Sequence, residues 1–160
     1  MPYSIDTSIV ITAWRDHYWP HIFTGFWERF NDAVEDGTFV AVQPVKDELV
    51  RKDDEIGKWA KAANGFFVPL EEDVQAAAID VLATHPGLIT QGGKRSTVDP
   101  FVIALGIARG IPVVSYERRS PNPEKPHIPN VCDDKHHPFM SIRELMTELG
   151  WNFPADALGR

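Results

Sequence analysis

The stretch that most constrains the fold reads as a buried helix followed by a buried strand. Asp99 and Pro100 precede an eight-residue apolar run, residues 101–108. An acid followed by proline is typical of a helix start, and a run that is apolar on nearly every face predicts a buried helix. Residues 111–115 then read as a short apolar strand. A helix that leads into such a strand is half of a β-α-β unit, so we expect an α/β fold with a mainly parallel sheet.

Similar patterns recur along the chain. Apolar strands are expected at 3–5 and 39–42, with weaker ones at 66–68 and 138–142. Helical periodicity is found over 23–36, 45–63, 71–85 and 141–151. Residues 118–130 contain four prolines, which predicts irregular structure. The length of 160 residues and the apolar fraction of 43% suit a single domain over 1–160.

Charge and composition exclude several classes of protein. The formal net charge of −7 argues against a broad electrostatic nucleic-acid binder. It leaves room for an enzyme that holds a cation and contacts a few phosphates. No segment approaches the ~20 apolar residues of a membrane helix, and no basic leader opens the chain. Cys132 is a lone cysteine, so we expect a cytoplasmic protein without internal disulfides.

Four acids stand at the ends of predicted strands or at the starts of predicted helices. Asp6 follows the first strand, and Glu48 lies one turn into the helix after the second. Asp99 opens the helix that enters the strand at 111–115, and Glu117 follows that strand. Parallel strands end at one edge of a sheet, so the four should converge there. Clustered carboxylates repel one another, and hard oxygen ligands favour Mg²⁺ or Mn²⁺.

Each acid also has a purely structural interpretation. Asp6 and Asp99 could be ordinary helix caps. Glu48 lies in the charged run 46–55, which is usually a solvated helix face. Glu117 could pair with one of the two arginines that follow it. Only the ordered set of four favours the functional interpretation.

The same residues resemble a known family. The motifs YSIDTS, PVKDEL, DPFVIALG and PVVSYE are similar, in order and spacing, to the four acidic motifs of the PIN domain superfamily. This resemblance implies a three-layer fold with a central sheet flanked by helices. It also implies a Mg²⁺- or Mn²⁺-dependent endoribonuclease, of the kind found in VapC-like toxins that pair with an antitoxin. The segment KPHIPNVCDD resembles a less characterised PIN-like branch with a long proline-rich C-terminal loop.

The resemblance implies roles for individual residues. The catalytic acids would be Asp6, Glu48, Asp99 and Glu117, of which Asp6, Asp99 and Glu117 would bind the metal and Glu48 and Glu117 would orient or deprotonate the attacking water. Side chains that hold these ligands in place would be Thr7, Ser8 and Ser115. Beside the resemblance, four cations flank two of the acids in the sequence and are candidates for phosphate contacts: Lys94, Arg95, Arg118 and Arg119. An additional ligand could come from Asp133 or Asp134.

Two departures from the family pattern leave alternatives open. The fourth acid is Glu117 where aspartate is more usual, and the loop after it is long and proline-rich. The alternatives are a catalytically silent module that binds RNA or protein, and a DNA nuclease. The expected partners are an RNA substrate, an antitoxin and a second copy of the chain. Trp14, Tyr18 and Trp19 could form such a protein interface or could pack internally.

Overall fold

The computed structural model describes residues 1–89 and 97–154 and contains a parallel sheet of five strands in the order β3-β2-β1-β4-β5. The first strand is central, with Tyr3 opposite Phe39 of β2 and Ser4 opposite Val113 of β4. The strands are β1 (Tyr3–Ile5), β2 (Phe39–Val42), β3 (Phe67–Val68), β4 (Val113–Val114) and β5 (Phe139–Met140). The mainly parallel sheet expected from the sequence is confirmed, including its two minor strands.

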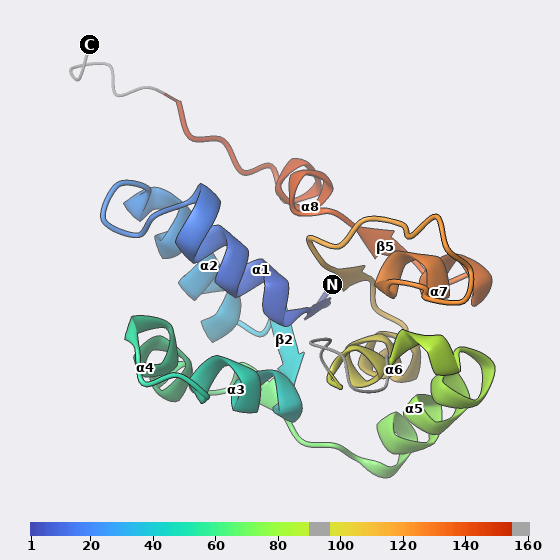
Figure 1. Cartoon of the computed structure of the whole chain (residues 1–160). Helices are drawn as coiled ribbons and strands as arrows, with labels where there is room; N and C mark the ends of the chain where they lie inside the picture. Colours follow the sequence, from blue (N-terminus) through green and yellow to red (C-terminus); the bar gives the residue numbers. More distant parts are fainter. Residues whose placement is uncertain (90–96, 155–160) are drawn as a thin grey trace.

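Helices flank this sheet and complete a three-layer α/β fold (Figure 1). The described helices are α1 (Thr7–Thr12), the π-helical turn η1 (Ala13–His17), α2 (Thr24–Glu35), α3 (Gln43–Val50), α4 (Glu55–Ala62), α5 (Glu72–Thr84), the 3₁₀ turn η2 (Pro86–Leu88), α6 (Asp99–Arg109), α7 (Ile128–Asp134) and α8 (Ile142–Glu148). The pairs α3–α4 and α5–α6 each lie side by side. Over the described residues, no helix combines the length and the apolar character needed to cross a membrane.

The predicted buried helix, α6, packs against the central strand. Val102, Ile103 and Leu105 are fully or almost fully buried, and the Ser4 hydroxyl of β1 donates to the Val102 carbonyl at 2.9 Å. The helix ends where the sequence indicates, because Gly110 adopts a left-handed conformation with φ 64°. This helix is therefore fixed against the strand that precedes Asp6.

Aromatic side chains fill the opposite part of the core. Tyr18 stacks on Phe26 with ring centroids 4.1 Å apart, and Trp14 meets the edge of Trp27 at 5.0 Å. Both residues therefore pack internally, whereas Trp19 keeps 43% of its surface exposed. The internal interpretation holds for two of the three aromatic residues considered as an interface.

One predicted helix is divided in two. The sequence predicts a continuous helix over 45–63, but α3 ends at Val50 and α4 begins at Glu55. Asp54 starts the second helix, because its side chain accepts a hydrogen bond from the Gly57 N–H at 2.9 Å and so caps α4. Within the charged run 46–55, residues 51–54 therefore form a bend between the two helices.

Two helix starts also differ from expectation. Asp99 was expected as the cap of α6, but Val98 holds that position and Asp99 is the first helical residue. The proline-rich segment was expected to be irregular through residue 130, but α7 begins at Ile128 with Pro129 in its first turn. Proline is compatible with that position because the first N–H groups of a helix have no partner inside the helix.

Close packing of α6 on β4 requires a glycine at position 106. A Cβ there would lie 2.6 Å from Cγ2 of Val113 and 2.9 Å from Nε2 of His137. We predict that Gly106→Ala destabilises the protein by about 1–3 kcal/mol, because overpacking outweighs the higher helix propensity of alanine. Thermal unfolding of the variant would show this as a lower melting temperature.

The matched control is Gly25→Ala in the first turn of α2. A Cβ at this position meets the Phe153 ring at an ordinary 3.5 Å, so the substitution should be neutral or slightly stabilising. Equal melting temperatures for the two alanine variants would contradict the packing argument.

Candidate functional site

Asp6 is a buried carboxylate at the carboxyl end of the central strand. It occupies the N-cap position of α1 but makes no side-chain capping hydrogen bond to that helix. Instead, its Oδ2 accepts hydrogen bonds from the hydroxyls of Ser8 at 2.6 Å and Ser115 at 2.7 Å. The residue is only 4% exposed. The cap interpretation is therefore wrong for this side chain, whose carboxylate is held by the two serine hydroxyls instead.

The two serines join the ends of β1 and β4. The Asp6 N–H donates to the Val114 carbonyl at 3.0 Å, which sets the two strand ends side by side. The Ser8 and Ser115 hydroxyls lie 3.2 Å apart. Ser8 also accepts from the Tyr116 N–H, and Ser115 accepts from the Glu117 N–H, both at 3.0 Å. The hydroxyls thus fix the backbone that leads from β4 to Glu117.

Burial raises the pKa of the Asp6 carboxyl to about 6. The hydrogen bonds from Ser8 and Ser115 favour the ionised form and oppose this rise, while the negative charges of Glu117 and Glu48 add to it. No ion pair between described residues includes Asp6, Glu48 or Glu117. The Asp6 carboxylate therefore lies within electrostatic reach of two other carboxylates, and none of the three is paired with a cation of the described residues.

A hydrogen bond from Thr7 connects Glu48 to the segment that contains Asp6. The Thr7 hydroxyl donates to Oε1 of Glu48 at 2.8 Å, and the glutamate is half-buried. Thr7 directly follows Asp6, so the hydrogen bond ties α3 to the start of α1. The sequence predicts Thr7 and Ser8 beside the first acid, and in the structure each contacts a carboxylate of the predicted set.

Asp99 lies at the same edge of the sheet by topology. The strand β4 is parallel to β1 and follows α6 directly, so α6 runs against the strands and begins where they end. Asp99 is the first residue of α6 and is 5% exposed. Within residues 1–89 and 97–154, however, no three His, Cys, Asp or Glu side chains form a preassembled metal-binding group.

Glu117 has a structural contact that the sequence does not predict. Its Oε2 accepts a hydrogen bond from the Ile128 N–H, the first of α7, at 2.9 Å. Nearby, Nδ1 of His127 lies 2.7 Å from the Arg118 carbonyl oxygen, and Oδ1 of Asn130 accepts from the Ser120 N–H at 2.7 Å. Hydrogen bonds therefore connect the two ends of the proline-rich loop, residues 117–120 and 127–130, and Glu117 makes one of them.

The predicted phosphate-binding cations differ in whether a carboxylate of the protein already binds them. Arg119 makes two hydrogen bonds to Asp133, at 2.6 and 2.9 Å, and this contact lowers the pKa of Asp133. Asp134 lies 2.8 Å from Nε2 of His85. Both aspartates considered as additional ligands thus have other partners. Arg118 is exposed, and the predicted contacts Lys94 and Arg95 lie outside the described residues.

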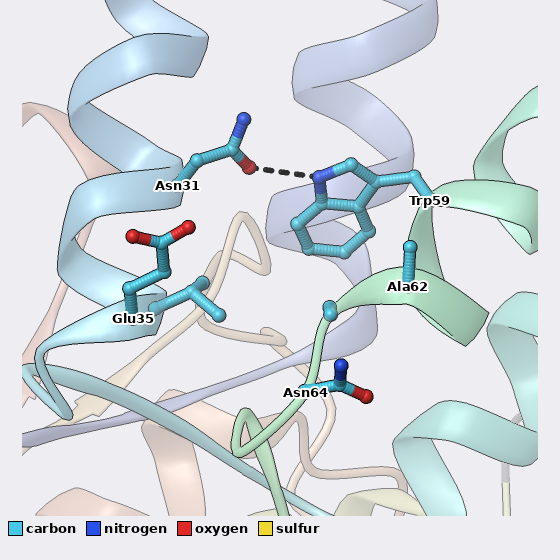
Figure 2. Close-up of a pocket in the computed structure, with 7 residues that line it drawn as sticks. Asn31, Glu35, Trp59, Ala62 and Asn64 are labelled. Atoms are coloured by element: carbon cyan, nitrogen blue, oxygen red, sulfur yellow. Dashed lines mark hydrogen bonds between the residues drawn. The ribbon is translucent and has the colours of Figure 1, made fainter.

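Two pockets contain residues that the sequence interpretation did not single out. One of about 200 Å³ includes Glu48 together with Arg15, Arg51 and Lys52. The other, of about 310 Å³, lies between α2 and α4 and contains none of the predicted site residues. Figure 2 shows this second pocket, where Oδ1 of Asn31 accepts from Nε1 of Trp59 at 2.8 Å. We call Asp6, Glu48, Asp99 and Glu117 the acid centre. The first pocket contains one of these residues, Glu48, and the second contains none.

Replacing Asp6 tests the cost of burying its charge. The pKa of Asp6 is raised from 3.8 to about 6 in the folded protein, so the folded state binds the proton more tightly than the unfolded state. The stability that this proton confers is present at low pH and is lost as pH rises through about 6. We predict that Asp6→Asn stabilises the protein by up to about 3 kcal/mol above this pH and by little near pH 4.

The measurement is thermal unfolding of both proteins in EDTA at about pH 4.5 and about pH 7.5. Asp47→Asn is the matched control, because Asp47 is an exposed carboxylate in α3 beside Glu48, and surface substitutions usually change stability little. A gain from Asp6→Asn that is the same at both pH values would contradict the burial argument.

The chain is similar in fold to a solved structure and matches one protein family, whereas no curated protein matches it. Among solved structures, its fold is similar to a chain of VapBC2 from Rickettsia felis, which was crystallised bound to a fragment of promoter DNA. The two chains are 11% identical with a TM-score of 0.52, and the match covers 88% of this chain and 98% of the other. This likeness supports the three-layer PIN-like fold. Residues 3–153 match the family described as a domain of unknown function, DUF4411, and the chain belongs to that family.

Proposed function

We propose that this protein is a divalent-metal-dependent endoribonuclease that hydrolyses phosphodiester bonds of RNA, and that it acts as the toxin of a toxin–antitoxin pair. The observation that carries the proposal is the buried Asp6 carboxylate, which two hydroxyls hold beside two further acids. Such an arrangement is costly in a metal-free protein, because like charges and desolvation both oppose ionisation. Costs of this kind are typical of functional sites.

The donor set is chemically suited to Mg²⁺ or Mn²⁺. Carboxylate oxygens are the ligands that these hard cations prefer. A divalent cation would favour the ionised form of Asp6 and so oppose the burial, and the smaller repulsion from Glu117 and Glu48, that raise its pKa. The residues that would hold it are Asp6, Asp99 and Glu117, the last with one oxygen already engaged by Ile128. The argument is one of donor chemistry and charge, since the described acids form no preassembled metal group.

The chain's own residues would divide the work of hydrolysis. A bound divalent cation supplies a nucleophile at neutral pH and offsets the charge that develops on phosphate. Asp6, with its pKa of about 6, is ionised at neutral pH and available as a ligand. The hydroxyls of Ser8 and Ser115 keep its carboxylate in place. Glu48, oriented by Thr7, would position or deprotonate the attacking water.

The partner part of the proposal comes from the fold. VapBC2, whose fold is similar, was crystallised bound to a promoter DNA fragment. For this chain we propose a protein antitoxin as partner. Trp19, Ile22 and Phe23 are exposed apolar side chains between η1 and α2 that give such a partner, or a second copy of the chain, a surface. We further propose a cytoplasmic protein of the PIN-like branch that has a long proline-rich loop.

Two other functions use the same fold. A catalytically silent module would bind RNA or protein without cleavage, and a DNA nuclease would cut the other nucleic acid. Mixed-sequence RNA and DNA of equal length, each incubated with and without Mn²⁺, separate all three. Metal-dependent loss of RNA alone supports the proposal. Cleavage of DNA alone, or of neither, favours a rival.

Metal binding should be visible in thermal stability. A cation that binds only the folded state stabilises it by mass action, so millimolar Mn²⁺ should raise the melting temperature of the wild type near neutral pH. The shift should shrink below pH 6, because Asp6 then holds a proton that competes with the metal. Asp6→Asn should remove most of the shift, and Asp47→Asn should keep it. An equal shift in wild type and Asp6→Asn would place the metal elsewhere.

Replacement of single acids separates chemistry from folding. Asp6→Asn should abolish RNA cleavage with the fold intact, because the amide is nearly isosteric but lacks the negative charge that a hard cation requires. Glu117→Gln should reduce the rate less, since one Glu117 oxygen already serves the start of α7. Gel assays of a labelled RNA would give both rates.

Matched preparations are needed, because a trace of contaminating ribonuclease would imitate activity. Asp47→Asn, purified in parallel, should cleave at the wild-type rate. If folded Asp6→Asn cleaves RNA as fast as wild type, the activity does not belong to this acid centre.

A further inference from the structure

We propose that Arg15, Arg51 and Lys52 form a binding site for the phosphodiester backbone of the nucleic-acid strand that enters the acid centre. This phosphate site rests on the proposed nuclease function and deepens it, because it assigns the path of the substrate. The three cations line one pocket of about 200 Å³ between α1, α3 and the start of α4. That volume is below the roughly 300–1,000 Å³ of pockets that enclose small ligands. A pocket of this size suits a nucleic-acid strand that lies across its opening.

Glu48 joins the phosphate site to the acid centre. It lines the pocket and also accepts the hydrogen bond from Thr7, the residue after Asp6. A nucleic-acid strand with one phosphate at the acid centre would therefore extend past Glu48 to these cations. This placement explains how a protein with a net charge of −7 could hold a polyanion, since the attraction is local.

The cations are available for phosphate. Arg51 and Lys52 are exposed, and neither takes part in an ion pair between the described residues. Arg15 contacts Asp54 at 3.2 Å through one nitrogen only, which orients the guanidinium and leaves other N–H donors. By contrast, Arg119 donates from Nε and from one terminal nitrogen to the two oxygens of Asp133. The cations near Glu48 are thus better placed for substrate than Arg119.

The bend that carries Arg51 and Lys52 is a packed element. Leu49 and Ile56 form its apolar floor and are almost fully buried. The backbone oxygen of Lys52 approaches Gly57 so closely that a Cβ at Gly57 would lie 2.7 Å from it. Asp54 closes the bend by capping α4. The two cations therefore project from a fixed backbone, which lowers the entropy lost when they bind phosphate.

The test measures binding without cleavage. Fluorescence anisotropy of a labelled single-stranded RNA of mixed sequence, titrated with wild-type protein in EDTA over a salt series, gives the slope of log K against log salt. For Arg51→Gln with Lys52→Gln, the slope should fall in magnitude by about 1.4, which is two lost contacts at about 0.7 each for a single strand. Between about 50 and 200 mM salt, wild type should then lose about sevenfold more affinity than the double variant.

The matched control is Lys61→Gln with Arg143→Gln, which removes the same charge from exposed positions in α4 and α8 and should keep the wild-type slope. A melting curve checks that both double variants fold. With a single-stranded DNA of the same sequence, the Arg51→Gln, Lys52→Gln protein should show the same fall in slope, because only the backbone is contacted. A fall in slope seen with RNA alone would contradict a backbone site.

Failure of this inference is distinguishable from failure of the proposed function. If wild type binds and cleaves RNA and the Arg51→Gln, Lys52→Gln protein keeps the same slope, the phosphate site is wrong and the nuclease stands. If both double variants lose slope equally, the attraction is diffuse and the site is also wrong. If wild type neither binds nor cleaves RNA, the proposed function fails and the phosphate site fails with it.

Discussion

The arrangement around the acid centre depends on holding one carboxylate inside the protein, where no described residue forms an ion pair with it. Hydroxyls from Ser8 and Ser115 hold Asp6 in this way. Ser8 lies in α1, the helix after β1, and Ser115 directly follows the adjacent strand β4. The same hydroxyls accept the backbone N–H groups of Tyr116 and Glu117. The hydroxyls that hold the Asp6 carboxylate therefore also set the direction of the backbone after β4, from which the proline-rich loop continues.

The sequence was informative where burial dictates residue type. The apolar run 101–108 has no polar face, so α6 could only lie against the sheet, as it does. The apolar residues of β1, β2 and β4 fixed the strands, and strand ends in a parallel sheet share an edge. Asp6 and Glu117 were predicted at that edge for this reason. These inferences required only local pattern and the rules of parallel sheets.

Features that depend on contacts between distant segments were not predictable. The charged run 46–55 has helical spacing, but its division rests on the capping by Asp54 and the close approach of Lys52 to Gly57. That division turns Arg51 and Lys52 from a solvated helix face into part of a pocket. The contact of Glu117 with Ile128 likewise joins residues across a loop whose prolines hide the start of α7. Nothing in the local sequence of either segment encodes its partner.

The central position of β1 has a consequence for the order in which the molecule assembles. Asp6 and Ser115 are separated by 109 residues, so their contact is among the most non-local in the fold and forms late in folding. With synthesis at about 5–20 residues per second, Ser115 leaves the ribosome about 5–22 s after Asp6. Throughout that interval the chain lacks β4 and Ser115, so the second hydroxyl that holds the Asp6 carboxylate is absent. The arrangement around Asp6 is therefore completed only after most of the chain has been made.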